Sequence, residues 1–283
     1  LVGSVYCPVC QLVLGGLTIL GPDDLAEVRM QTNQLRSPQP QKENGSARYD
    51  EAVILGLGLV LALWLRFLLW PYETADYHDF FGPWYDHLQA SGGFRGLATV
   101  AANYTPPYLY LLTLVVTWLP RVPKLLGIKL IGICFDFAAA LVVYKIVKLR
   151  HPRGWLPLLA ALLLLFAPTV VLNGALWGQV DIIYTTCLLA SVYWLLTQRP
   201  ALALAAFGVA LSFKLQAIFI VPLLLILLWR GELVRWFHFL LVHFTFAGMM
   251  VHAWLAGRPF LDPLTIYLQK ADTYQQLTQN APN

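Results

Sequence analysis

The sequence contains little charge for its length. Asp, Glu, Lys and Arg together make up 12% of the 283 residues, about half the share that soluble domains use to solvate their surface. Hydrophobic residues make up 58%, and they gather in blocks that are too long for the helices of a soluble core. These features exclude an ordinary soluble domain. They predict an all-α integral membrane protein, built as a multi-spanning helical bundle.

Other signals are also missing. The net charge is only +4, and there is no basic stripe with interleaved aromatic residues, so we expect no nucleic-acid partner. The chain has no glycine-rich phosphate loop, because GLGLV at 56–60 lies inside an apolar block and is better explained by helix packing. Cys7 and Cys10 form a lone CxxC, a weak metal or redox signal without a second pair of ligands. We therefore predict neither a cofactor nor a metal site.

Composition divides the chain into two parts. Residues 1–49 include the polar run SPQPQKENGS and are predicted to be a disordered cytoplasmic lead-in. Residues 50–283 form the predicted membrane module, and its stretch at about 71–124 is largely too rich in Asp, His, Tyr and Gly to cross lipid. The apolar blocks predicted to cross are Ala52–Trp70, Leu125–Val147, Leu156–Leu172, Ile182–Thr197, Ala201–Phe213, Ala217–Trp229 and Phe237–Ala256.

The apolar block Tyr108–Leu119 has two interpretations. It is short for a crossing, which favours a helix at the membrane interface. If it does not cross, the positive-inside rule is satisfied, because one group of basic residues shares the side of the N-terminus: Lys145, Lys148, Arg150, Arg153, Arg199, Arg230 and Arg235. If the block crosses, that group of basic residues faces outward, and only Arg121 and Lys124 lie on the side of the N-terminus. We therefore predict one large outer loop at about 71–124 that contains short interfacial helices.

With this topology, three polar segments meet at the outer face. They are the loop around Asp76, the turn NGALWGQVD at Asn173–Asp181, and the break SFKLQ at Ser212–Gln216. Helices that end in polar residues at membrane depth are tolerated where they line a cavity. The sequence therefore predicts a polar cavity that opens outward.

The outer loop carries the acidic candidates. Asp76 and Asp79 lie close to Trp84 in ETADYHDFFGPWYDHL, and Tyr104 follows in NYTPPYLYLL. A carboxylate beside aromatic rings, at the edge of a low-dielectric region, can act as a general base for a hydroxyl nucleophile. The same carboxylates would also serve simply to solvate a loop. An Asp/His metal site is a third interpretation, although the Asp–His spacings in the loop place no two ligands on one helical face.

Two charged residues lie within the apolar blocks. Arg66, near the end of the first block, is expected to extend to the lipid head groups. Asp136, within GICFDFAAALVV, either pairs with a basic residue such as Lys129 or belongs to the cavity, because a charge inside a span is costly. Pairing is the favoured interpretation.

The turn and the break carry further candidates. Asp181 is expected to cap the helix that follows it, a role that does not explain the neighbouring Trp177 and Gln179. An aromatic surface with amide hydrogen bonds is what a sugar or a head group needs. Lys214, with Gln216 nearby, separates two apolar helical pieces. An ammonium there either faces a phosphate or extends outward to the interface.

In this order, DYHDFFGPWYDHL, NYTPPYLYLL, WGQVD and SFKLQAIFIVPLLL resemble the GT-C superfamily of multi-spanning glycosyltransferases. The resemblance covers about residues 50–283. It is strongest to bacterial mannosyltransferase-like members that use polyprenyl-phosphate-linked sugars. It implies inverting transfer of a hexose, mannose or glucose, from such a donor to a hydroxyl of a glycan, lipid or protein acceptor at the outer face.

The resemblance also implies roles for the candidate residues. An Asp of the first outer loop would be the general base, matched first by Asp76 and second by Asp79. Lys214 would face the donor phosphate. The residues expected to bind substrate are Trp84, Tyr104, Trp177, Gln179, Asp181, Lys214 and Gln216.

The same resemblance implies a multi-pass protein of the bacterial inner membrane. Family members complete the lipid-donor site in C-terminal spans beyond the point where this sequence ends. The alternative is a transporter or lipid flippase with the same cavity, a class that often shows interrupted spans in both halves of the chain. A third interpretation is a scaffold, in which Asp76 and Lys214 would tolerate neutral replacement.

Overall fold

The computed structural model describes residues 45–231, 233–262 and 265–266. The chain divides into two units, residues 1–50 and 51–283. Of the first unit, only residues 45–50 are described, as the start of helix α3. The remainder of the predicted lead-in, with Cys7 and Cys10, lies outside the described residues.

The described residues of the second unit are mostly helical and contain no strand, as predicted. Seven longer α-helices are joined by shorter helices and helical turns. In chain order the elements are α3 (Gly45–Leu69), η1 (Tyr77–Phe81), α4 (Gly82–Ala90), η2 (Gly93–Ala98), α5 (Pro106–Trp118), α6 (Lys124–Arg150), α7 (Leu156–Phe166), α8 (Pro168–Val171), η3 (Leu172–Trp177), α9 (Asp181–Leu196), α10 (Pro200–Phe213), η4 (Leu215–Ile220), α11 (Val221–Arg230) and α12 (His238–Leu255).

Three of the described helices are long and apolar enough to cross a membrane: Glu51–Leu69 within α3, α6 and α12. A fourth crossing results if α7 and the bent segment Pro168–Trp177 are one span, with a bend of 49° between them. The apolar segments α9, α10 and Leu215–Arg230 are shorter. Of the predicted crossings, Ala52–Trp70, Leu125–Val147 and Phe237–Ala256 therefore correspond to helices of spanning length, and Leu156–Leu172 corresponds to the bent pair. The other three correspond to shorter helical segments.

Proline and glycine determine several of the helix ends. α5 begins at Pro106 and Pro107. Proline is well suited to the first turn of a helix, because an N–H there would make no intrahelical hydrogen bond and because the φ angle of proline is already helical. α3 ends two residues before Pro71, since a residue that precedes proline is disfavoured in the helical region. α11 ends at Gly231, which has a left-handed φ of 67° and terminates the helix in the usual way.

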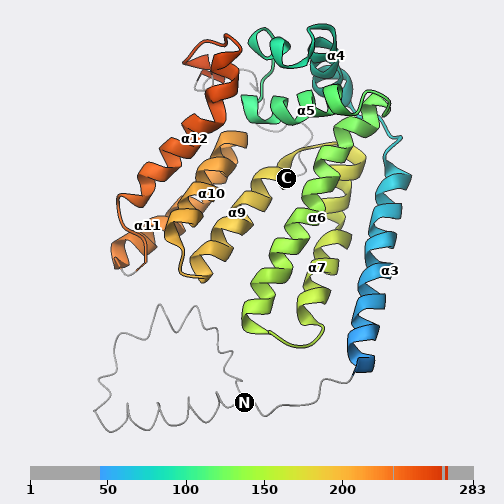
Figure 1. The fold of residues 1–283 in the computed structure, drawn as a ribbon, viewed down its shortest axis with the longest axis vertical. Helices are drawn as coiled ribbons and strands as arrows, with labels where there is room; N and C mark the ends of the chain where they lie inside the picture. Colours follow the sequence, from blue (N-terminus) through green and yellow to red (C-terminus); the bar gives the residue numbers. More distant parts are fainter. Residues whose placement is uncertain (1–44, 232, 263–264, 267–283) are drawn as a thin grey trace, which may run out of the picture. The chain divides into compact units, whose positions relative to one another are not determined.

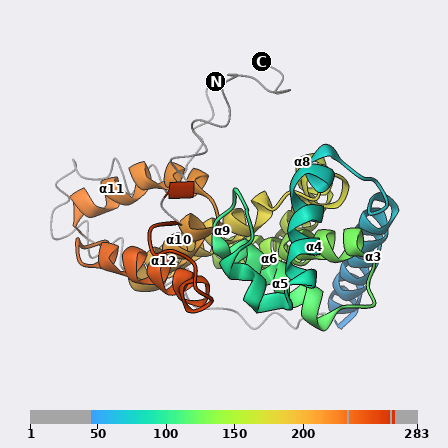
Figure 2. The same ribbon diagram turned by 90° about the horizontal axis from the view of Figure 1, so that it is seen from above.

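The helices pack side by side, and α5 lies across their upper ends (Figure 1). α6 packs on α7 and α9, and α10 packs on α9 and α12. Seen from above, α3 lies at one edge of this unit and α11 and α12 lie at the opposite edge (Figure 2). The exposed apolar side chains of α3 are those expected of a helix that faces lipid.

The segment predicted to be the outer loop holds several short helices. It contains η1, α4, η2 and α5, and α5 is not among the described helices that qualify as membrane spans. The α6–α7, α9–α10 and α11–α12 connections lie at the lower end in Figure 1, and the basic residues lie in these connections or in the adjoining ends of α6 and α11. This arrangement agrees with the positive-inside argument and leaves the polar segments at the opposite end.

Candidate functional site

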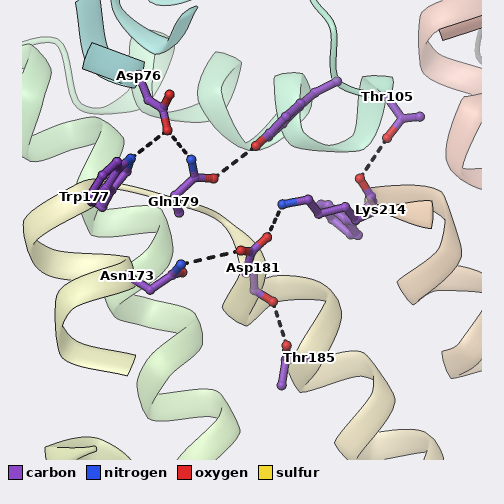
Figure 3. Close-up of polar contacts among 10 residues, drawn as sticks. Asp76, Thr105, Asn173, Trp177, Gln179, Asp181, Thr185 and Lys214 are labelled. Carbon is purple, nitrogen blue, oxygen red and sulfur yellow. Dashed lines mark hydrogen bonds and ion pairs between the residues drawn. The ribbon is translucent and has the colours of Figure 1, made fainter. Parts of the chain in front are cut away.

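Asp76 lies immediately before η1, and its carboxylate accepts two hydrogen bonds from one turn of the chain. Oδ2 accepts from Nε1 of Trp177 at 2.7 Å and from Nε2 of Gln179. The two donors converge on the carboxylate in Figure 3. Among the described residues, no hydrogen bond reaches Oδ1. Both described hydrogen bonds of the carboxylate therefore converge on one of its two oxygens.

The turn that carries both donors depends on a glycine. After the π-helical turn η3, Gly178 adopts a left-handed φ of 77°, a conformation that strains any residue with a Cβ. The N–H of Gly178 donates to the carbonyl of Gly174 at 3.0 Å, and the N–H of Gln179 donates to the carbonyl of Asn173 at 2.9 Å. The reversal at Gly178 allows Trp177 and Gln179, on either side of it, to reach the same carboxylate.

Gln179 connects the carboxylate to an aromatic cluster. The Tyr104 hydroxyl donates to Oε1 of Gln179 at 3.1 Å, while the amide nitrogen of Gln179 donates to Asp76. Trp84 is buried, and its ring centroid lies 5.4 Å from that of Tyr104 and 6.3 Å from that of Tyr108. Burial, and secondarily the nearby Tyr104, raises the pKa of Tyr108 well above its usual value. Tyr108 is therefore a neutral, buried phenol within this aromatic cluster.

Two cavities flank this cluster. A small one of about 50 Å³ is lined by Asp76, Tyr104 and Gln179, and a larger one of about 380 Å³ is lined by Asp79 and His87. Both are also lined by Phe80, Trp84 and Asn103. The two acidic candidates therefore face neighbouring cavities, and Asp79 is the more exposed of the two.

Lys214 forms an ion pair with Asp181. Lys214 has extended backbone angles, φ −154° and ψ 135°, between α10 and η4, so the helix is interrupted at the residue that carries the charge. Its Nζ also lies 5.8 Å from the centroid of the Tyr104 ring. The Thr105 hydroxyl donates to the carbonyl of Ser212 at 2.6 Å, which fixes the end of α10 against the start of α5.

One expectation about this region was wrong. Asp181 does not cap α9: Val180 is the capping residue, without a side-chain hydrogen bond, and Asp181 is the first helical residue. Its carboxylate is used by Lys214 and by a long contact of 3.5 Å from the Asn173 amide. Gln216 is exposed in η4, and none of the described contacts joins it to the other candidates.

The charges within the spans are paired differently from what we expected. Arg66 is fully buried, so it does not extend to the head groups, and its Nε donates to Oδ2 of Asp136 at 2.7 Å. The same guanidinium also donates to the carbonyls of Ala62 and Leu165. Lys129 is not the partner of Asp136, since its ammonium donates to main-chain carbonyls instead. That Asp136 has a structural ionic partner was correctly predicted, but the partner was not.

Sequence reasoning missed Thr74, whose hydroxyl donates to the Trp177 carbonyl at 3.0 Å. A threonine in a polar loop gives no signal of such a contact. Within residues 45–231, 233–262 and 265–266, no three His, Cys, Asp or Glu side chains gather closely enough to hold a metal ion.

A comparison with protein-family models matches the chain to the model described as glycosyltransferase family 87, over residues 103–281. The match covers more than half of the chain. The chain belongs to glycosyltransferase family 87. This family is of the GT-C type, as the sequence motifs suggested. Neither the curated proteins nor the solved structures searched gave a match.

Membership of family 87 makes this membrane protein a glycosyltransferase, which acts on a sugar donor and an acceptor. It favours the enzyme over the transporter and the scaffold that the sequence left open. The matched region includes the turn at 173–181 and Lys214, but it begins after Asp76. Asp76 joins the family region through the hydrogen bonds from Trp177 and Gln179.

Proposed function

We propose that this glycosyltransferase moves a hexose from a polyprenyl-phosphate-linked donor to an acceptor hydroxyl at the outer face of the membrane, with inversion at the anomeric carbon. Asp76 is the general base. The observation that carries the proposal is the geometry of its carboxylate: Oδ2 accepts hydrogen bonds from Trp177 and Gln179, while Oδ1 accepts none from the described residues and Asp76 lines a cavity.

The chemistry requires few groups. The acceptor oxygen attacks the anomeric carbon from the face opposite the phosphate, its proton passes to Oδ1 of Asp76, and the polyprenyl phosphate leaves with the electron pair of the broken C–O bond. The phosphate is already a good leaving group, so positioning and removal of the proton are the main tasks of the protein. Asp79 is the weaker candidate, because it is exposed and faces the neighbouring cavity.

Lys214 supports the choice of a phosphate-linked donor. Its ammonium is mostly buried, with 15% of the side chain exposed, and among the described residues its one carboxylate partner is Asp181. An ammonium has three donors, so a phosphate oxygen can bind it beside Asp181. The lysine lies where α10 is broken, and a lipid phosphate would reach this position while its tail stays in the bilayer.

The acceptor in this proposal is a glycan, lipid or protein hydroxyl, and the membrane is a bacterial inner membrane. The aromatic surface of Trp177, half exposed beside Asp76, suits the apolar face of a sugar ring. The amide of Gln179 and the hydroxyl of Tyr104 supply hydrogen bonds next to that surface.

The proposal is tested by measuring sugar transfer in membranes from a radiolabelled polyprenyl-phosphate hexose. We expect Asp76→Asn to lower the rate by about a hundredfold or more, the usual contribution of a general base. Asp86→Asn is the matched control, because Asp86 is an exposed loop carboxylate that pairs with Lys124 outside the cavities. Wild-type transfer by Asp76→Asn would refute the assignment of the base.

A further inference from the structure

Lys129 is a buried cation with an unusual set of partners. The residue lies on α6 with 1% of its surface exposed. Its Nζ donates to three main-chain carbonyls, of Tyr72 at 2.6 Å, Leu176 at 2.8 Å and Leu69 at 3.4 Å. Among the described residues, no carboxylate forms an ion pair with it. A buried ammonium that relies on carbonyls is costly, so its position requires an explanation.

The two short bonds go to the two segments that form the candidate site. Tyr72 belongs to the segment that leads to Asp76, and Leu176 directly precedes Trp177. A further hydrogen bond joins the same segments, from the Thr74 hydroxyl to the carbonyl of Trp177 at 3.0 Å. The ammonium therefore links the backbone before the proposed base to the backbone of its hydrogen-bond donors.

A simpler role would be to neutralise the carbonyl end of α3, where a cation is favourable. That role accounts for the contact with Leu69, the last residue of α3, but not for contacts with carbonyls outside α3. The Leu69 bond is the longest of the three, and the two shorter bonds reach outside α3. The observed geometry is that of a link between two segments.

The side chain of Lys129 also supports the turn by packing. A Cβ added at Gly178 would lie 3.6 Å from Cγ and 3.7 Å from Cε of Lys129, so the left-handed glycine lies directly on the lysine stem. On the same helix, a Cβ at Gly132 would lie 3.4 Å from the Gln179 carbonyl oxygen. The turn that presents Trp177 and Gln179 therefore rests on this part of α6.

We propose that Lys129 is a positioning residue for the transfer reaction, which holds the Asp76 segment in register with the Trp177–Gln179 turn. This inference rests on the proposed role of Asp76 as the base. Lys129 lines neither cavity, so it does not contact the substrate there. Its loss lets the carboxylate move relative to its two donors, and a small misplacement of a reacting group is enough to lower kcat severely.

The test is steady-state kinetics on the full chain in membranes, per amount of folded enzyme, with a polyprenyl-phosphate hexose as donor. Lys129→Met keeps the stem and removes the ammonium. We expect its kcat to fall by about tenfold to a hundredfold, with KM for the donor within about twofold of wild type. Lys129→Arg restores part of kcat, because its donors can reach the same carbonyls. Lys148→Met is the control, a lysine of the same helix whose Nζ contacts only Tyr144 among the described residues.

Thr74→Val is the second variant, since it removes the hydrogen bond from Thr74 to Trp177, which joins the same two segments, without altering a membrane span. We expect kcat to fall severalfold at unchanged KM. Wild-type kcat in folded Lys129→Met would overturn the inference. If Lys129→Met does not fold, wild-type kcat in Thr74→Val overturns it, and a lowered kcat supports it.

Asp76→Asn, measured in parallel, separates this inference from the proposed function. An inactive Asp76→Asn together with a normal Lys129→Met overturns only the positioning role. An active Asp76→Asn overturns the assignment of the base, and the positioning role with it.

Discussion

The indole of Trp177 donates a hydrogen bond of 2.7 Å to the carboxylate of Asp76, across 101 residues of sequence. The bond joins the outer loop to the turn before α9, and it is made by a ring that is itself half exposed. Trp177 therefore has an edge that orients the proposed base and a face that can meet a substrate. A substitution that separates these two properties is informative.

We expect Trp177→Phe to lower kcat by about threefold to tenfold. Phenylalanine keeps an aromatic face and loses the Nε1 donor, and a hydrogen bond to a charged group contributes about 1.5–3 kcal/mol when buried. Partial exposure of the ring reduces that figure. KM for the acceptor should change little, because the aromatic surface remains.

The measurement is initial-rate kinetics of sugar transfer, with Trp155→Phe as control. Trp155 is 60% exposed and lies at the start of α7, at the opposite end from the site. Unchanged kcat in Trp177→Phe would mean that the indole N–H does not orient the base.

The Lys214–Asp181 pair gives a second prediction, in which the two partners behave oppositely. Lys214→Met removes the cation proposed to meet the donor phosphate, so KM for the donor should rise by about tenfold, a typical loss for a charge-assisted contact. Asp181→Asn removes a carboxylate that repels the phosphate and competes for the ammonium. KM for the donor should fall or stay the same.

Donor titrations of both variants with a radiolabelled polyprenyl-phosphate hexose provide the measurement. If the pair were only structural, the two variants would lower stability alike and leave KM unchanged in the enzyme that remains folded. A normal KM in Lys214→Met would therefore remove the phosphate role.

The sequence was sufficient to place the polar segments together. A loop that cannot cross lipid, a WGQVD turn before an apolar block and a lysine between two apolar pieces lie at the same membrane face once the crossings are counted. The structure brings Asp76, Gln179 and Tyr104 into one hydrogen-bonded chain, with Lys214 and Asp181 beside it.

The ionic partners of the buried and partly buried charges could not be predicted. A helix that is apolar all round gives no signal of which side faces its neighbours, so the sequence left open whether Asp136 meets Lys129 or another cation. Arg66 and Asp136 are 70 residues apart, and only the packing of α3 on α6 and α7 brings them together. Asp181 was assigned to a local cap for the same reason: its actual partner, Lys214, is 33 residues away.

A third prediction concerns the stability of this buried pair. Both side chains of Arg66 and Asp136 are 0% exposed, and removing one partner of such a pair leaves an uncompensated charge that costs about 3–5 kcal/mol. We expect Arg66→Leu and Asp136→Leu each to lower the free energy of unfolding by about that much. The double variant should recover much of the loss, since no unpaired charge remains.

Denaturant titrations in detergent micelles, or thermal melts of the purified protein, would measure these effects. Additive losses in the double variant would show that the two residues act independently. That result would contradict the hydrogen bond at 2.7 Å between Nε and Oδ2.

The last prediction concerns the close approach of α10 and α12. A Cβ added at Gly208 would lie 2.7 Å from the Val242 carbonyl oxygen and 2.9 Å from the Val242 Cα, and it would also overlap the Thr245 hydroxyl. Small residues allow helix backbones to approach closely in membranes. Gly208→Ala must therefore push the two helices apart or distort them, at a cost of about 1–3 kcal/mol for overpacking.

Gly248→Ala, on α12, is the matched control, because nothing lies within 4 Å of the added Cβ. Alanine is favoured over glycine inside a helix by roughly 0.5–1 kcal/mol, so this variant should be as stable as wild type or slightly more so. Gly208→Ala should thus lower the melting temperature, whereas Gly248→Ala should leave it unchanged or raise it slightly, although both make the same chemical change. Equal shifts would mean that α10 and α12 can separate without cost. In that case the close contact between α10 and α12 would not be what holds Lys214, the residue that follows α10, in its place.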